Sequence, residues 1–158
     1  MPTSSPRAKD AISLLRADHR LVSDLFEQFE KSRSPARKQV LVNQICKELT
    51  IHAQVEEELF YPAVKQALRD TELVPEARVE HESLKQLISK IQSLPPDDEA
   101  FKASVIVLSE YVKHHVKEEQ NEMFPKVKAS KLDLKALALA ILERKHELME
   151  QVPETGMA

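Results

Sequence analysis

The chain has 158 residues, of which 31% are charged, with a single glycine and no tryptophan. This length suits one domain that can bury an apolar core without disulfides. A composition so poor in glycine favours long helices over sheets, which need turn residues at short intervals. The formal net charge is -3 with both signs interspersed, so the chain offers no basic footprint for nucleic acid.

Several features bear on where the protein works. The single cysteine, Cys46, permits no internal disulfide. Residues 1–10 lack the apolar region of a signal peptide, and no apolar run approaches the roughly 18 residues of a membrane-spanning helix. We therefore expect a soluble cytoplasmic protein with neither a membrane nor a nucleic acid as its partner.

Apolar residues recur at intervals of three and four along most of the chain, which is the period of an amphipathic helix. This periodicity predicts helices over residues 8–32, 35–68, 75–93, 98–125 and 133–151. Ser34 followed by Pro35 is typical of a helix start. Pro62 should kink the second helix, or end it and begin a short continuation. Residues 94–96, Leu-Pro-Pro, form the clearest break in the sequence.

The connections between the first four helices are short, so successive helices should run antiparallel. The expected fold class is therefore all-α: an up-down-up-down four-helix bundle over residues 8–128, with an additional C-terminal helix over residues 129–151. Residues 1–7 should form a flexible leader, and residues 152–158 a disordered tail.

Two short motifs place a histidine four residues before a glutamate: His52 with Glu56, and His115 with Glu119. Four residues turn a helix by about 400°, so each pair lies one turn apart on nearly the same face. Both pairs fall on the apolar seam of their helix, where a carboxylate is costly unless a positive charge balances it. Two seams with the same feature indicate one shared cation site.

An internal repeat adds two more histidines. His19 in the first helix and His81 in the third are each the single polar member of an apolar seam, and the second motif follows the first after 63 residues. The chain is therefore organised as two helical hairpins, each with two histidines and one glutamate that can meet at one level of the core. The candidate metal ligands are His19, His52, Glu56, His81, His115 and Glu119.

Four neutral imidazoles and two carboxylates suit a divalent metal such as iron, manganese or zinc. A single tetrahedral zinc ion needs only four donors, whereas two ions use the whole set. In the arrangement that we favour, the two histidines of each hairpin bind one ion and the two glutamates bridge both ions. A further anionic bridge, hydroxide or oxide, would balance the remaining charge and leave room for a small exogenous ligand.

Neighbouring histidines leave alternatives open. His114 could pair with Glu118 at the same spacing of four residues, although the repeat and the apolar seam favour His115. Glu143 and His146 form the Glu-x-x-His pair that ferritin-like di-iron bundles use twice, but here the pair occurs once and beyond the bundle.

Other polar residues near the motifs have weaker claims to the site. Four glutamates are expected to be solvated, or to orient a histidine by accepting its second N–H: Glu57, Glu58, Glu80 and Glu122. Tyr61 is expected to be a core or boundary residue. Tyr111, one turn before His115, could hydrogen-bond to a ligand on the metal.

In its order of histidines and His-x-x-x-Glu motifs, and in the Leu-Leu-Arg-Ala-Asp-His sequence of residues 14–19, the chain resembles the hemerythrin-like (HHE cation-binding) domain family over about residues 8–128. The resemblance implies a four-helix bundle with two non-haem iron ions, oxo- or hydroxo-bridged, that bind or react with O2, NO or peroxide. All six candidate ligands match family ligands.

One departure from the family bears on function. Oxygen-carrying members have a fifth histidine where this chain has Ala77, and they space the last pair as His-x-x-x-x-Asp rather than His-x-x-x-Glu. The four-histidine, two-glutamate set is more similar to bacterial di-iron proteins of nitrosative stress and iron–sulfur repair, and to iron-sensing relatives. The repair proteins have a cysteine-bearing N-terminal segment, whereas the residues given before His19 contain no cysteine.

The resemblance therefore favours a di-iron protein that binds or senses O2, NO, peroxide or redox state over an oxygen carrier. An enzyme that breaks down peroxide or reduces NO is the first alternative, and an iron-storage or interaction module is the second. The apolar stripe of residues 133–151 could dock on the bundle or join two chains as a homodimer.

Overall fold

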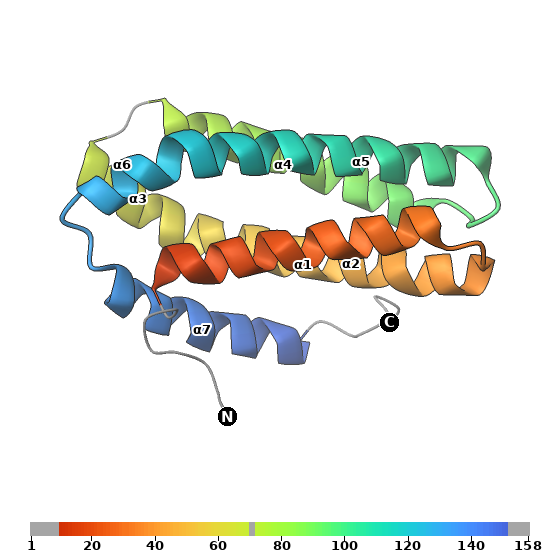
Figure 1. Cartoon of the computed structure of the whole chain (residues 1–158), viewed down its shortest axis with the longest axis horizontal. Helices are drawn as coiled ribbons and strands as arrows, with labels where there is room; N and C mark the ends of the chain where they lie inside the picture. Colours follow the sequence, from red (N-terminus) through yellow and green to blue (C-terminus); the bar gives the residue numbers. More distant parts are fainter. Residues whose placement is uncertain (1–9, 70–71, 152–158) are drawn as a thin grey trace.

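The structure, a computed structural model, describes residues 10–69 and 72–151. Within these ranges the chain is helical and contains no strand. The predictions for residues 1–7 and 152–158 lie outside the described residues. Figure 1 shows an elongated bundle in which two helical hairpins lie side by side, with one further helix against the first hairpin. The expected all-α bundle with an additional C-terminal helix is confirmed.

Each hairpin pairs two long helices. The elements are α1 (Ala11–Lys31), α2 (Pro35–Val55), η2 (Glu56–Phe60), α3 (Tyr61–Leu68), α4 (Leu73–Ser93), α5 (Glu99–Glu118), η3 (Glu119–Met123), α6 (Phe124–Ala129) and α7 (Leu134–Gln151). Helix α1 packs on α2 and helix α4 on α5, as the repeat predicts. The fourth predicted helix extends through α6, and the third begins at Leu73, two residues before the predicted start at Pro75.

Side-chain caps begin three of the long helices. Asp10 accepts a hydrogen bond from the backbone N–H of Ser13 at 2.8 Å at the start of α1. Ser34 accepts one from Arg37 at 3.1 Å, with proline in the first turn of α2 as expected from the sequence. Asp98 begins α5 in the same way. These caps satisfy backbone donors that lack an intrahelical partner, so the helices start at defined residues.

The two larger apolar clusters of the described residues are separated by a polar layer. One cluster lies toward the α1–α2 and α4–α5 loops and includes Phe26, Phe29 and Phe101. The other lies at the opposite end and includes Phe60, Phe124 and their neighbours. The buried histidines and glutamates lie in the layer between these clusters. The long helices therefore hold the polar layer away from both ends of the bundle.

Two π-helical turns, η2 and η3, interrupt the second helix of each hairpin at the same place in the repeat. In each turn the backbone N–H five residues on bonds to the glutamate carbonyl: Tyr61 to Glu56 and Phe124 to Glu119. A proline follows directly, Pro62 and Pro125, and proline cannot donate and crowds the preceding turn. The predicted continuation after Pro62 is present as α3, and the local response is a widened turn, a feature often found at functional sites.

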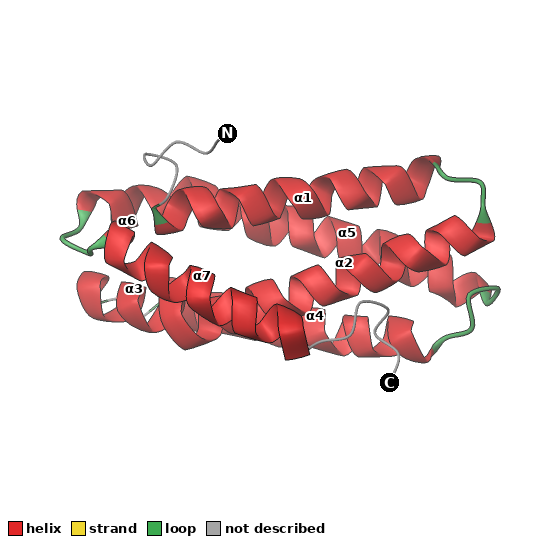
Figure 2. Ribbon diagram, turned by 90° about the horizontal axis from the view of Figure 1, so that it is seen from below, coloured by secondary structure: helices red, strands yellow, loops and turns green. Residues whose placement is uncertain are grey.

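Helix α7 covers the first hairpin. Its buried residues Ala138, Ile141 and Leu148 face inward, and two of them form a small cluster with Ile51 and Val55. Figure 2 shows α7 crossing this face of the bundle at an angle. The apolar stripe of α7 thus docks on its own bundle, while a homodimer through this helix stays a prediction. Among the described residues, no helix combines the length and apolar character needed to cross a bilayer.

Candidate metal centre

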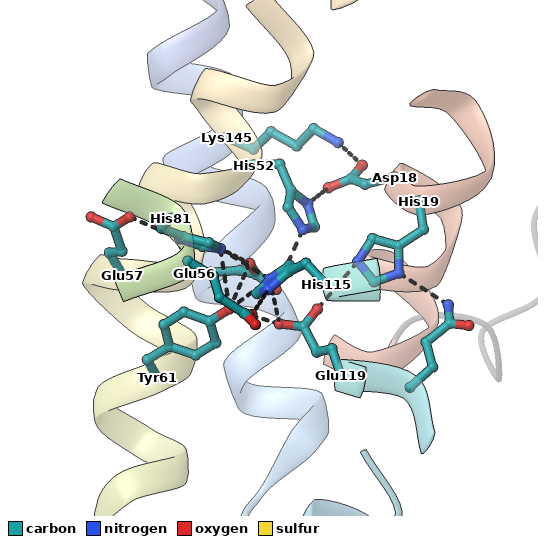
Figure 3. Close-up of polar contacts among 12 residues, drawn as sticks. Asp18, His19, His52, Glu56, Glu57, Tyr61, His81, His115, Glu119 and Lys145 are labelled. Atoms are coloured by element: carbon teal, nitrogen blue, oxygen red, sulfur yellow. Dashed lines mark hydrogen bonds and ion pairs between the residues drawn. The ribbon is translucent and has the colours of Figure 1, made fainter. Parts of the chain in front are cut away.

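The polar layer brings together all six side chains singled out from the sequence. They project inward from α1, α2, η2, α4, α5 and η3, and each residue is at most 9% exposed. Figure 3 shows the imidazoles and carboxylates converging between the four long helices. Metal binding by these residues stays a prediction.

Glu56 faces both hairpins. Its Oε2 lies 3.3 Å from Nε2 of His52 in the same hairpin, and its Oε1 lies 3.1 Å from Nε2 of His81 in the other. The carboxylate is fully buried. A carboxylate that presents one oxygen to each of two imidazoles is placed to bridge two cations.

Glu119 has the equivalent position in the second hairpin. Its Oε1 lies 3.2 Å from Nε2 of His19, and its Oε2 lies 3.5 Å from Nε2 of His115. The donor atoms fall into two overlapping groups, each within 4.8 Å: His19, His52, Glu56 and Glu119 in one, and Glu56, His81 and His115 in the other. These are the two histidine pairs that the repeat indicated.

A carboxylate holds three of the four imidazoles through Nδ1. The pairs are His52 with Asp18 at 2.8 Å, His81 with Glu57 at 2.8 Å, and His115 with Glu80 at 2.6 Å. An ionised carboxylate only accepts hydrogen bonds, so the proton lies on Nδ1 and Nε2 is turned toward the centre. This is the usual arrangement around histidines that bind a metal. The roles anticipated for Glu57 and Glu80 are therefore present, and Asp18 has the same role.

His19 is held differently. Its Nδ1 lies 3.0 Å from the side-chain nitrogen of Gln120, which donates to it. A half-turn of the amide would present its oxygen instead and place the proton on Nδ1. Lys145 of α7 approaches from the other side of the site and donates to Asp18, so the hydrogen bonds that orient His52 extend to the C-terminal helix.

The donors fit a pair of divalent metal ions. Four buried atoms have no hydrogen-bond partner although they lie close to one another: His19 Nε2, His52 Nε2, Glu56 Oε2 and Glu119 Oε1. In the second group, Nε2 of His81 and Nε2 of His115 face each other at 3.2 Å. Buried polar atoms are normally paired, so atoms aimed at a common point without a bond suit a shared cation. Imidazole and carboxylate donors suit iron, zinc or manganese.

Protons can balance the two carboxylates when no metal does. Burial lowers the pKa of His52, but the charge of Glu56 and the hydrogen bond to Asp18 outweigh it and raise the pKa well above 6.5. Burial also opposes the charged form of His115, yet Glu119 and its other carboxylate neighbours raise the pKa to about 9. Burial alone would raise the pKa of Glu56. The neighbouring His52 and His81 have the opposite and larger effect, so the pKa lies well below its usual value.

Tyr61 is fully buried in the core, as expected, and its hydroxyl also lies inside the site, a role that the sequence did not indicate. Its hydroxyl donates to Glu119 at 2.7 Å and lies 3.1 Å from Glu56. The same oxygen lies 3.2 Å from His81 Nε2 and 3.3 Å from His115 Nε2. Burial and the two carboxylates raise the pKa of this phenol well above 10. Tyr61 thus occupies the middle of the second group of donors.

The π turns explain this position and make the two halves of the site unequal. In such a turn, residue i+5 bonds to residue i and stays over it, whereas in an α-helix it would rotate away. Tyr61 stays over Glu56 in this way, and Phe124 stays over Glu119. The ring of Phe124 stacks near His19, with centroids 6.1 Å apart, and has no hydroxyl. One half of the site therefore has a phenol where the other has an apolar ring.

The remaining candidates lie outside the buried group. The His114 side chain is 66% exposed and the His115 side chain 8%, so the structure places His115 at the centre. Tyr111 is 51% exposed and lies outside the buried group, so its contact with a ligand on the metal stays a prediction. His146 is exposed on α7 and pairs with Glu150.

A small cavity adjoins the site and is lined by residues of α1, α2, α4 and α5. It measures about 40 Å³, room for a few water-sized molecules. All four site histidines line it, and most of its other walls are apolar side chains such as Leu49, Leu84 and Val112. The cavity places a small molecule against the donor atoms in an environment poor in hydrogen-bonding groups.

Comparison with known proteins agrees with the helical bundle and identifies its family. The model of the hemerythrin HHE cation binding domain matches residues 10–127, so the chain belongs to this family of cation-binding helical bundles. A hemerythrin HHE cation binding domain-containing protein from Mycobacterium kansasii has the same fold, with a TM-score of 0.78 and 22% identity over 90% of this chain and 89% of that one.

One curated relative is longer than this chain. It is a protein of Nostoc sp. named DNA nickase, and it is 32% identical over 115 residues. The matched region is 73% of this chain but 32% of the relative, so the chain spans about a third of that protein's length. Helix α7 begins at Leu134, beyond the part that the family model matches.

Proposed function

We propose that the protein binds two iron ions at the buried His–Glu site and uses them to bind or sense a small molecule: O2, NO or peroxide. The observation that carries the proposal is the cavity of about 40 Å³ that all four site histidines line. A site for a large substrate would need an open cleft, whereas this cavity holds only a molecule of a few atoms. The location in the cytoplasm stays a prediction.

The residues of the chain would share the work in a defined way. The two glutamates, each with one oxygen toward either histidine pair, would bridge the ions. Asp18, Glu57 and Glu80 hold three imidazoles in the required orientation. Bound iron would supply redox chemistry and open coordination positions for the ligand.

The surroundings of the site favour a ligand that is small and weakly polar. Leu49, Leu84 and Val112 line the cavity and limit the water that can reach the donors. The Tyr61 hydroxyl donates a hydrogen bond to Glu119 and so fixes the direction of that carboxylate. An enzyme acting on peroxide or NO would use the same residues, and no described residue outside the site favours that alternative specifically.

We do not extend DNA nicking to this chain from the Nostoc relative. The match covers 32% of that protein, and the formal net charge of -3 does not favour binding to a phosphate backbone. The absence of nucleic-acid partners stays a prediction.

A cavity-filling substitution tests the proposal. Ala53 lines the cavity and is half-buried, so Ala53→Phe should place a ring in it without altering a ligand. We expect unchanged iron content and strongly reduced binding of NO to the iron-loaded protein, measured by absorption spectroscopy. Ala103→Phe, at an exposed position of α5, is the matched control and should bind NO normally. Equal NO binding by both variants would refute the assignment of the cavity.

A further inference from the structure

Another group of side chains of the kind that can hold a metal lies outside the buried site, between α4 and α5, and is called the outer group here. It consists of Glu80, His114 and Glu118, whose donor atoms lie within 4.8 Å of one another. His114 Nε2 is 3.5 Å from Glu118 Oε1 and 3.9 Å from Glu80 Oε2. The carboxyl groups of both glutamates therefore lie beside one exposed imidazole.

The outer group shares one carboxylate with the buried site. Oε1 of Glu80 accepts the Nδ1 hydrogen of His115 at 2.6 Å, while its Oε2 faces His114. Glu80 therefore contacts both the exposed imidazole of His114 and the buried imidazole of His115. A cation held by the outer oxygen would lie next to the inner site.

An acidic cleft leads from this group toward the core. It measures about 30 Å³, and four glutamates line it: Glu76, Glu80, Glu118 and Glu122. His115 and Glu119 also line the cleft, and Glu119 is 3% exposed with an Oε1 atom that has no hydrogen-bond partner. The small side chain of Ala77 forms part of the wall. A cleft of one charge sign raises the local concentration of the opposite ion.

We propose that Glu80, His114 and Glu118 form an outer site that takes a divalent transition-metal ion from solution and passes it through the acidic cleft to the buried donors. One imidazole and two carboxylates, completed by water, suit Fe²⁺, Mn²⁺ or Zn²⁺. Glu119 gives the ion a destination, because this residue lines the cleft and also belongs to the buried group. The uptake role rests on the proposed function, whereas binding at the outer site does not.

Binding at the outer site is tested with Mn²⁺ on the full chain after treatment with a chelator. We expect one weaker Mn²⁺ binding event in addition to the buried ones, detected by the electron paramagnetic resonance of the free ion. His114→Ala and Glu118→Gln should each weaken this event about tenfold, because each removes a donor at a divalent ion. Both positions are exposed, so the variants should keep the helical content of the parent.

His146→Ala is the matched control. His146 and Glu150 form an exposed pair at 3.4 Å with the same spacing of four residues, but the pair is not part of a three-residue metal-binding group. This variant should bind Mn²⁺ like the parent. If His114→Ala and His146→Ala bind equally well, the outer site does not exist.

Uptake is tested by the rate at which Fe²⁺ enters the buried site under anaerobic conditions. His114→Ala and Glu118→Gln should load about tenfold more slowly and reach the same final iron content. Equal rates in all variants would overturn the uptake role even where Mn²⁺ binds. A parent that takes up no iron would refute the proposed function and the uptake role together, while the Mn²⁺ result would still decide the outer site.

Discussion

Raising the pH should destabilise the metal-free protein, because folding raises the proton affinity of a site histidine. Burial lowers the pKa of His115, but Glu119, Glu56 and Glu80 together raise it from 6.5 to about 9. A group whose pKa is higher in the folded state stabilises that state fully below its unfolded pKa. The stabilisation is then lost as the pH rises from about 6.5 through about 9.

The size of the effect follows from the pKa shift. Each pKa unit corresponds to about 1.4 kcal/mol, so His115 should contribute about 3 kcal/mol at pH 6 that is absent at pH 10. This is a large part of a typical free energy of unfolding of about 5–15 kcal/mol. The pKa of His52 is raised as well, so its contribution has the same sign.

Urea unfolding of chelator-treated protein at several pH values between 6 and 10 measures this loss. His114→Ala should keep the pH dependence, since His114 is exposed, while His115→Gln should remove the part of about 3 kcal/mol that His115 contributes. Saturating Zn²⁺ should also flatten the curve, because a metal-bound imidazole no longer takes up the proton. A free energy of unfolding that stays constant or rises between pH 6.5 and 9 in the metal-free protein would refute the reasoning.

Three further predictions concern residues that contact the site or the C-terminal helix. Tyr61→Phe removes a hydroxyl that bonds two carboxylates, and should lower the free energy of unfolding of the metal-free protein by about 2 kcal/mol in urea. Lys145→Met removes a charge that holds Asp18, and should weaken metal binding about tenfold in a chelator competition. Ile141→Ala should cost about 2–4 kcal/mol in thermal unfolding, whereas Leu139→Ala, which is 71% exposed, should cost less than about 0.5 kcal/mol.

Each of these results has a clear contrary outcome. An unchanged unfolding curve for Tyr61→Phe would mean that its hydrogen bonds do not stabilise the site. Equal metal affinity in the Lys145→Met variant would show that α7 does not influence His52. Equal losses at Ile141 and Leu139 would contradict the docking of α7 on the bundle.

Much of the site could be predicted because α-helical periodicity is a local property. His52 and Glu56 share a face at a spacing of four residues, and the repeat places His115 and Glu119 equivalently. Short connections then force the hairpins together, so the four seams meet at one level. These inferences need only the helix period and chain connectivity, and the structure agrees with both.

The missed residues depend on features that this period does not contain. Tyr61 lies five residues after Glu56, a spacing that faces the site only in the π turn that precedes Pro62. Asp18 lies next to His19 along α1, yet it serves His52 on α2, a contact set by packing between helices. The proline after each π turn was a signal that could have indicated the change of period.

The most direct test of the central claim is a titration of chelator-treated protein with Fe²⁺ under anaerobic conditions. We expect two tightly bound ions per chain, and a loss of tight binding in both Glu56→Gln and Glu119→Gln because each carboxylate faces both histidine pairs. A parent that binds one ion or none, or a Glu56→Gln variant that retains both with unchanged affinity, would contradict the carboxylate-bridged pair.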